Sequence, residues 1–274
     1  MLGSKYKQHA VNMRKNILKM VTEAKSGHPG GSLSAVEILT ALYFTQMDIT
    51  QENLNSIERD RFVLSKGHAS PVLYAVLCEK GFLLEEELCT FRKIGSRLQG
   101  HPSMCMLDGV DMSTGSLGQG ISAAVGMALS NKAHQKPYRI YTLLGDGELQ
   151  EGEVWEAAMC ASHYQLDNLL AFVDFNGLQI DGNICDIMNP TPIDEKFKAF
   201  GWHVITLEDG NDIEQVIQAC EEAKTVKGKP TVVIAKTVKG KGVSFMENQY
   251  TWHGVAPSVE QCEEAIQELE GGRS

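Results

Sequence analysis

The sequence predicts a doubly wound α/β fold, in which a mainly parallel sheet carries helices on both of its faces. Short apolar runs alternate with helical patterns along the chain, and this alternation is typical of parallel sheets. No internal repeat and no long linker interrupts the alternation. With 274 residues, the chain is long enough for one large hydrophobic core. We therefore expect a single domain over residues 1–270 and a frayed tail over residues 271–274.

Each expected strand is a run of four to six mostly apolar residues between turn residues. These runs cover residues 61–64, 140–144, 169–172, 203–207 and 231–235. The expected helices show apolar residues at helical spacing before and between these runs. They cover residues 5–25, 35–46, 70–80, 118–135, 152–164, 194–199, 212–224 and 259–269.

Composition excludes several classes of function. The formal charge is −10 and no basic block stands against it, which argues against a nucleic-acid or membrane-surface partner. No apolar run approaches the ~20 residues of a membrane span, and no apolar signal-peptide core follows the basic N-terminal residues. The seven cysteines are an odd number without a C-x-x-C pair, which favours reduced thiols of a cytoplasmic protein over a zinc site.

Glycine-rich stretches fall where the expected strands end, which is where ligands of such sheets bind. They are S-G-H-P-G-G (26–31), S-K-G-H-A-S (65–70), Q-G-H-P-S (99–103), S-T-G-S-L-G-Q-G (113–120), L-G-D-G (144–147), D-F-N-G (174–177) and K-T-V-K-G-K-G (236–242). None of them is a P-loop, and no G-x-G-x-x-G follows a strand, so the common nucleotide fingerprints are missing.

The turn after the second strand is acidic, although a glycine-rich turn usually meets phosphate. A divalent cation between an aspartate and a diphosphate would explain this, because Mg²⁺ is bound through carboxylate, carbonyl and phosphate oxygens. Asp146 follows one strand and Asn176 follows the next, so both side chains and a carbonyl near Leu178 could converge on one ion. The alternative is two ordinary turns, in which Asp, Asn and Gly are common. The paired arrangement favours the metal, and Mg²⁺, Ca²⁺ or Mn²⁺ would suit it.

Asp-Gly followed about thirty residues later by Asn is also the signature of thiamine-diphosphate enzymes. Over residues 5–257, seven blocks resemble the diphosphate-binding domain of transketolase and occur in that family's order. They are S-G-H-P-G-G, L-S-K-G-H-A-S, Q-G-H-P, S-T-G-S-L-G-Q-G, G-D-G-E-L-Q-E-G-E-V-W-E-A, A-K-T-V-K-G-K-G and W-H-G. The resemblance implies that Asp146, Asn176 and the Leu178 carbonyl bind the metal and that the metal binds the diphosphate of thiamine diphosphate.

Four of the eight histidines lie beside glycine in these loops, namely His28, His68, His101 and His253. Any one of them alone would be read as a surface or capping residue, but four at one sheet edge favour a site. By resemblance, His68 and His253 contact the diphosphate side of the cofactor. His28 and His101 contact the hydroxyls and carbonyl oxygen of the ketose donor. Imidazole can move protons near pH 7, so His28, His101 and His253 are expected to take part in catalysis.

Two lysines stand in loops near the expected diphosphate. Lys239 matches a transketolase pattern in which this lysine meets the cofactor, whereas Lys66 could equally be a solvated side chain. One position departs from several relatives: they carry a serine that touches the diphosphate where this chain has Gly31, so that hydroxyl contact is lost.

Further contacts follow from the resemblance alone. The segment that cradles the thiazolium and offers backbone to the aminopyrimidine is Gly115, Ser116 and Leu117. Gly147 and Glu151, in and after the acidic turn, are also expected to bind the cofactor. Glu151 and Glu156 could simply stabilise a helix dipole, or they could belong to the carboxylates that link two active sites in this family.

The resemblance covers about the first two-fifths of a transketolase. In the family, the glutamate that activates the aminopyrimidine comes from a second, pyrimidine-binding domain. We therefore expect the N-terminal subunit of a split, cytoplasmic transketolase, with a C-terminal subunit that carries the remaining domains, most simply as α2β2. The expected reaction is two-carbon ketol transfer between sugar phosphates. An artificial truncation would be the other explanation of the length.

Three other functions share the metal motif or the fold. Two are thiamine-diphosphate enzymes, namely 1-deoxyxylulose-5-phosphate synthase and the first component of 2-oxo acid dehydrogenases. The placed histidines and K-T-V-K-G-K-G with W-H-G argue against both. The third is a non-catalytic, thiamine-diphosphate-binding regulatory module, against which the intact metal and sugar-contacting residues argue.

Overall fold

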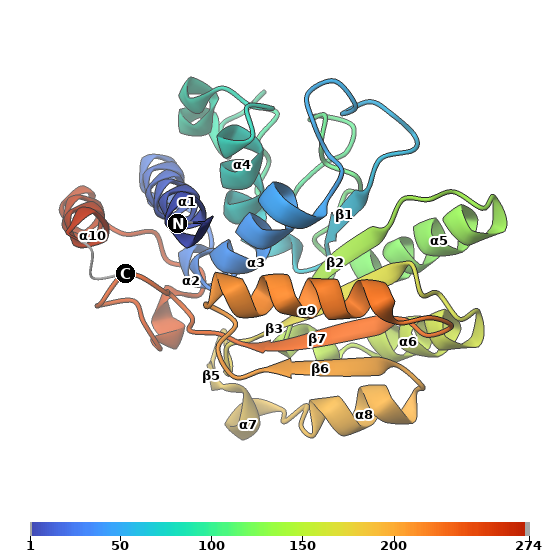
Figure 1. Cartoon of the computed structure of the whole chain (residues 1–274). Coiled ribbons are helices and arrows are strands. Elements are labelled where there is room, and N and C mark those ends of the chain that lie inside the picture. The colour runs from blue at the N-terminus through green and yellow to red at the C-terminus, as the bar shows by residue number, and fades with distance from the viewer. Residues whose placement is uncertain (1, 272–274) are drawn as a thin grey trace.

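A five-stranded parallel sheet forms the centre of the molecule, and the computed structural model describes residues 2–271 of the chain (Figure 1). Its spatial order is β1-β2-β3-β7-β6, and every neighbouring pair is parallel. The strands are β1 (Arg61–Leu64), β2 (Ile140–Gly145), β3 (Leu169–Phe175), β6 (His203–Leu207) and β7 (Thr231–Lys236). The predicted fold class and all five strands are confirmed. Residues 272–274 of the predicted tail lie outside the described residues.

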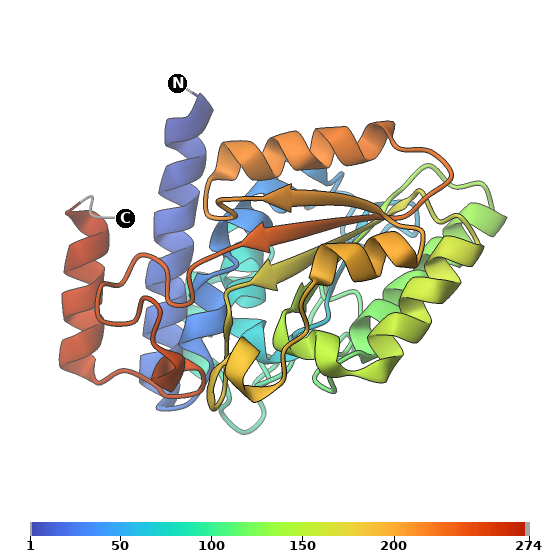
Figure 2. The same cartoon turned by 90° about the horizontal axis from the view of Figure 1, so that it is seen from below.

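Helices cover both faces of this sheet, as Figures 1 and 2 show. One hydrophobic cluster joins the sheet to α1 (Leu2–Ala24), α3 (Val36–Ala41), α4 (Ser70–Glu79) and α9 (Ile213–Thr225). A second cluster joins the opposite face to α5 (Gln119–Ala133), α6 (Gly152–His163) and α8 (Ile193–Ala199). Successive side chains of a strand enter different clusters, because they point to opposite faces of the sheet. Tyr141 and Leu143 belong to the first cluster, and Ile140 and Leu144 to the second.

The helix α10 (Val259–Glu270) packs against α1, away from the sheet (Figure 2). Its start is fixed by a capping box, in which the side chains of Ser258 and Gln261 each accept the backbone N–H of the other. The loop between β7 and α10 carries Lys239 and His253, two of the predicted site residues.

Several short elements were not predicted. The second half of the stretch S-G-H-P-G-G begins α2 (Pro29–Leu33), which starts at a proline whose fixed φ suits the first helical position. The helix predicted over 35–46 is α3 followed by a π-helical turn, η1 (Leu42–Gln46). After β3 come the hairpin strands β4 (Leu178–Gln179) and β5 (Gly182–Asn183) and the helix α7 (Ile184–Ile187). The described residues also form the 3-10 turns η2 (Gly67–Ala69), η3 (Glu85–Thr90), η4 (Gly147–Gln150) and η5 (Tyr250–Trp252).

Two further findings concern the cysteines and the apolar character of the helices. All seven cysteines are free thiols, as their number and spacing predict. Among residues 2–271, no helix has both the length and the apolar character needed to cross a membrane.

Candidate active site

A cavity of about 310 Å³ lies where β1, β2, β3 and β7 end, and the glycine-rich loops surround it. Most of the predicted site residues line it. These residues are His28, His68, Gly115, Leu117, Asp146, Gly147, Glu151, Asn176, Leu178, Lys239 and His253. Two predicted residues, Ser116 and His101, lie outside the lining. A larger cavity of about 470 Å³, between α1 and the start of α9, contains none of the predicted residues.

The three predicted metal ligands come together beside the ends of β2 and β3. Both carboxylate oxygens of Asp146 accept backbone N–H groups, from Gly147 at 2.8 Å and from Gly177 at 2.6 Å. The amide oxygen of Asn176 accepts the N–H of Leu178 at 3.2 Å. The bond from Gly177 to Asp146 joins the two loops at the carboxyl edge of the sheet, and the other two bonds fix the side chains within their own loops.

This group fits a hard divalent cation. Burial and the neighbouring charge of Asp174 raise the pKa of Asp146 to about 6. A cation bound beside Asp146 would therefore stabilise its ionised carboxylate. A cation already lies against the third ligand, because the Lys239 ammonium donates to the Leu178 carbonyl at 3.0 Å. Over residues 2–271 no cluster of three or more His, Cys, Asp or Glu could hold a metal. The donors that Asp146, Asn176 and Leu178 offer are carboxylate, amide and carbonyl oxygens, which Mg²⁺ and Ca²⁺ prefer.

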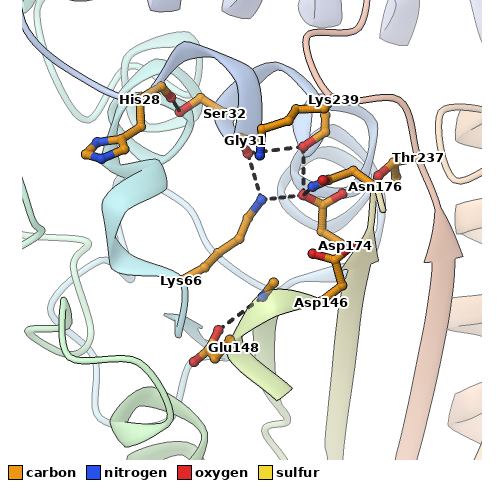
Figure 3. Close-up of polar contacts among 12 residues, drawn as sticks. His28, Gly31, Ser32, Lys66, Asp146, Glu148, Asp174, Asn176, Thr237 and Lys239 are labelled. Atoms are coloured by element: carbon orange, nitrogen blue, oxygen red, sulfur yellow. Dashed lines mark hydrogen bonds and ion pairs between the residues drawn. The ribbon is translucent and has the colours of Figure 1, made fainter. Parts of the chain in front are cut away.

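The two predicted lysines are almost fully buried, Lys66 at 1% and Lys239 at 2% exposure, and they have different partners. The Lys66 ammonium forms an ion pair with Asp174 and donates to the Gly31 carbonyl at 2.7 Å (Figure 3). The Lys239 ammonium lies 3.1 Å from Nδ1 of His253. Burial lowers the pKa of Lys239 to about 8. Of the two, Lys239 is the cation left to meet an anion in the cavity.

Asp174 organises the loops around the cavity, and sequence reasoning did not identify it as a site residue. Its fully buried carboxylate pairs with Lys66 and accepts the hydroxyl of Ser34 at 2.7 Å, the hydroxyl of Thr237, and the amide N–H of Asn176 at 3.1 Å (Figure 3). Burial alone would raise the pKa of Asp174, but the charge of Lys66 and these hydrogen bonds outweigh it and hold the pKa below its usual range. The bond to Asn176 also orients that amide.

Glu148 is a second buried carboxylate that the sequence did not single out. It accepts the hydroxyl of Ser65 and the backbone N–H groups of Gly118 at 2.9 Å and Gly145 at 3.0 Å. Burial raises its pKa. Its carboxylate therefore joins the loops after β1 and β2 to the start of α5. In the sequence, the position of Glu148 in the motif G-D-G-E was the feature that could have marked it as a site residue. An acid at this position is also common at the start of a helix, so the motif did not distinguish the two roles.

Three of the predicted histidines form one cluster. The ring centroids of His28, His68 and His253 lie 5.2–5.5 Å apart. Burial is the main cause that lowers their pKa values, to about 4 for His28, to about 3 for His253, and well below the usual value for His68. All three imidazoles are therefore uncharged at neutral pH. Nδ1 of His28 is buried and has no hydrogen-bond partner among the described residues.

His101 lies at the rim of the site rather than inside the cavity. Its ring packs on Gly115, where an added Cβ would stand 3.0 Å from the imidazole. Gly115 also has a φ of +153°, so a glycine is needed there on both counts. Burial, and then the nearby Arg92, lower the pKa of His101.

Glu151 and Glu156 are both exposed in this chain. Glu151 immediately precedes α6, and its Cβ and Cγ lie near Gly118. The acid in the first turn of α6 is Glu153, so the dipole explanation applies better to that residue.

These features define a class of protein. The fold is a doubly wound sheet, and its carboxyl edge combines an oxygen site for a cation, a buried lysine and neutral histidines, as expected of a domain that binds a metal-bound anionic cofactor. Residues 6–270 match the family model described as transketolase, thiamine diphosphate binding domain. The chain therefore belongs to this family.

Similar proteins fall into two groups by length. The chain is 47% identical to the 6-deoxy-6-sulfo-D-fructose transketolase subunit SqwG of Clostridium sp. (strain MSTE9), across 96% of each chain. It is 42% identical to one of the separate subunits of the apulose-4-phosphate transketolase of Phocaeicola vulgatus, across 93% of this chain and 90% of that one. Human transketolase is 44% identical, but this chain covers only 42% of it.

A solved structure agrees with these relatives. Transketolase from Campylobacter jejuni superposes with a TM-score of 0.90 at 35% identity, across 97% of this chain and 42% of that one. The chain thus spans about two-fifths of the full-length transketolases and nine-tenths or more of the separate subunits. The prediction of a thiamine-diphosphate-binding transketolase subunit is confirmed.

Proposed function

We propose that this chain, together with a second polypeptide, catalyses two-carbon ketol transfer between sugar phosphates. The convergence of Asp146, Asn176 and the Leu178 carbonyl beside Lys239 is the observation that carries the proposal. These oxygens would hold Mg²⁺, or Ca²⁺ or Mn²⁺, and through it the diphosphate. When bound, thiamine diphosphate supplies the carbon nucleophile that accepts the two-carbon unit.

The remaining residues divide into two ends of one site. Lys239, His68 and His253 form the diphosphate end, together with the glycines of the lining, Gly31 and Gly147, whose missing side chains leave room for phosphate oxygens. The segment Gly115, Ser116 and Leu117 supports the thiazolium.

His28 and His101 form the substrate end and bind the hydroxyls and carbonyl oxygen of the ketose. Because the pKa of each is lowered, both imidazoles are uncharged at neutral pH and can accept a hydrogen bond from a sugar hydroxyl. The two separate subunits similar to this chain are named for 6-deoxy-6-sulfo-D-fructose and apulose-4-phosphate, both anionic sugars, which supports an anionic ketose here as well.

The second polypeptide supplies what this family needs beyond the diphosphate site: a glutamate for the aminopyrimidine and an apolar pocket for that ring. The separate subunits that match nearly end to end support this division between two chains. We propose an α2β2 assembly with a two-fold axis, located in the cytoplasm. Glu151 and Glu156, both exposed on this chain, would lie at its interface.

Substitution of the central carboxylate tests this function. In the assembled enzyme, Asp146→Asn keeps the size of the side chain and removes its charge, so it should abolish metal-dependent binding of thiamine diphosphate in calorimetric titration. Asp186→Asn, which neutralises an exposed carboxylate on α7, is the matched control and should bind like the wild type. At 100 times the dissociation constant a ligand stabilises its protein by about 2.7 kcal/mol. Cofactor and Mg²⁺ should therefore raise the melting temperature of the control but not of Asp146→Asn. Unchanged affinity in Asp146→Asn would exclude the assignment.

A further inference from the structure

Arg92 lies between the two loops that carry the substrate-end histidines. It follows η3 and adopts a left-handed backbone with φ of +60°, which is unusual for a residue other than glycine, asparagine or aspartate. Its backbone N–H donates to the Leu98 carbonyl at 2.9 Å. A strained backbone held by its surroundings is often found at a functional position.

The guanidinium of Arg92 contacts both loops. Nη1 donates to the hydroxyl of Ser26 at 3.3 Å, two residues before His28. On its other side the guanidinium lies against Gly100, the residue before His101. A Cβ added to Gly100 would stand 2.8 Å from Cζ of Arg92 and 3.0 Å from Nε and Nη2. The guanidinium also lies over the ring of Phe91, with Cζ 5.5 Å from the centroid. Arg92 therefore joins two segments that are more than seventy residues apart in the sequence.

We propose that Arg92 is a positioning residue for the ketose, because its guanidinium holds the loop of His28 against the loop of His101 and so sets the separation of the two imidazoles. The proposal rests on the proposed function in one respect only, the assignment of His28 and His101 to the substrate. Neither the family model nor the names of the similar proteins assign a role to this residue.

The positive charge of Arg92 also affects the pKa values of both histidines. Burial is the main cause that lowers the pKa of His28, and the charges of Arg92 and Lys239 add to it. The other groups that face His28 are the rings of His101, His68 and His253, which are neutral at neutral pH, and His101 adds a charge only when it is protonated. Arg92 is the charged group that acts on His101. Removing the guanidinium should therefore make both histidines easier to protonate, while Lys239 continues to act on His28.

Three variants separate position from charge. Arg92→Met removes both the charge and the two-sided contact. Arg92→Lys keeps the charge, but a single ammonium cannot reproduce the planar fork that meets both loops. Lys93→Met is the matched control, because Lys93 is exposed and adjacent, and its ammonium pairs with Glu23 at 3.0 Å. Arg92 is itself exposed, so these changes leave the core intact.

Kinetics of the assembled enzyme form the first test. We expect Arg92→Met to lower kcat/KM for the ketose donor about tenfold or more, since small misplacements of catalytic groups are costly. Its dissociation constant for thiamine diphosphate should stay within about twofold of the wild type. The acidic limb of the kcat/KM profile should move upward by about half a pH unit, the shift expected from loss of one exposed charge. Arg92→Lys should keep the limb and lose part of kcat/KM, and Lys93→Met should change neither.

A second measurement does not depend on activity. The imidazoles of His28 and His101 can be titrated by NMR in the full-length chain, with signals assigned through His28→Gln and His101→Gln. Both pKa values should rise in Arg92→Met and stay in place in Arg92→Lys and Lys93→Met. Unchanged titration, unchanged kcat/KM, or an equal loss of cofactor affinity in Arg92→Met would each overturn the role of Arg92. An inactive wild-type assembly would instead refute the proposed function, and the NMR titration would then decide the role of Arg92 by itself.

Discussion

Burial controls the protonation of individual residues in this site. It raises the pKa of Asp146 to about 6 and lowers that of Lys239 to about 8, because a low-dielectric environment disfavours charge of either sign. It also keeps His28 and His253 neutral. The cavity of about 310 Å³ thus contains groups whose ionisation a ligand can readily shift, as the proposed binding of a metal cation and a diphosphate would require.

The lowered pKa of His28 predicts a pH dependence of stability. In the unfolded chain a histidine titrates near 6.5, whereas in the folded chain burial holds the pKa of His28 at about 4. Between these values the unfolded state binds more protons, so the free energy of unfolding should fall as the pH drops from 6.5 towards 4. His28→Gln should remove part of this loss, roughly 1 kcal/mol at pH 5, since the partly exposed ring is screened by solvent. Urea unfolding at pH 7 and pH 5, without cofactor, measures it.

His163→Gln is the control, because it removes an exposed ring at the end of α6, outside the lining of the cavity. If wild type and His28→Gln lost the same stability between pH 7 and pH 5, the neutral state of His28 would not be what the fold maintains.

At the scale of elements, the start of α5 is joined closely to the loop after β1. The hydroxyl of Ser65 accepts the N–H of Ile121 at 3.0 Å and donates to Glu148. Gly120, in the first turn of α5, faces the backbone of Ser65 so closely that an added Cβ would stand 2.5 Å from Cα of Ser65. This contact places the end of the segment that precedes α5, residues 115–117, beside the cavity.

Two glycine-to-alanine changes on α5 should therefore have opposite effects. Gly120→Ala meets backbone, which cannot move aside, so we expect a loss of about 1–3 kcal/mol in the free energy of unfolding. Gly126→Ala meets nothing within 4 Å and should gain up to about 1 kcal/mol from higher helix propensity. Urea denaturation of both variants measures the difference, and Gly120→Ala should also weaken cofactor binding. Equal effects of the two changes would show that Gly120 does not hold α5 in place.

For the whole molecule, several large apolar side chains are exposed around the site. Ile180, Ile187 and Met188 lie on the segment after β3. Ile180, which lines the cavity, is 65% exposed. Apolar groups gathered beside a ligand site are typical of surfaces that another protein covers. This distribution is consistent with an assembly in which a second chain closes the site.

The isolated chain should be catalytically silent. At saturating thiamine diphosphate and Mg²⁺ we expect no ketol transfer by this polypeptide alone, because residues 6–270 match the diphosphate-binding domain and the proposed function assigns the glutamate for the aminopyrimidine to a second polypeptide. Once the C-terminal subunit is added, activity should appear together with a heterotetramer in light scattering, since permanent complexes of this kind bury large apolar interfaces. Substantial turnover by the chain alone would overturn the division of the enzyme between two subunits.

Much of the fold follows from local patterns. The apolar runs predicted all five sheet strands, and helical spacing predicted the long helices, because both depend on which side chains along a short segment must leave water. The place of the candidate site could also be predicted, because Asp146 and Asn176 follow neighbouring strands and parallel strands end at one edge of the sheet. The repeated glycine and histidine in the loops pointed to the same edge, and most of those residues line the cavity.

The tertiary structure decided the partners of buried charge. Asp174 and Glu148 looked like ordinary residues at strand ends, yet each gathers donors from several loops. Lys66 could have been a free cation until the fold placed it in contact with Asp174, which is 108 positions away in the sequence. The tertiary structure likewise decided the strand order β1-β2-β3-β7-β6 and the contact of Arg92 with two distant loops. A local sequence pattern shows which side chains of a segment must be buried. It does not show which charged groups meet in the buried site, because those groups come from segments that are distant in the sequence. Their pairing is therefore decided only by the packing of the helices against the sheet.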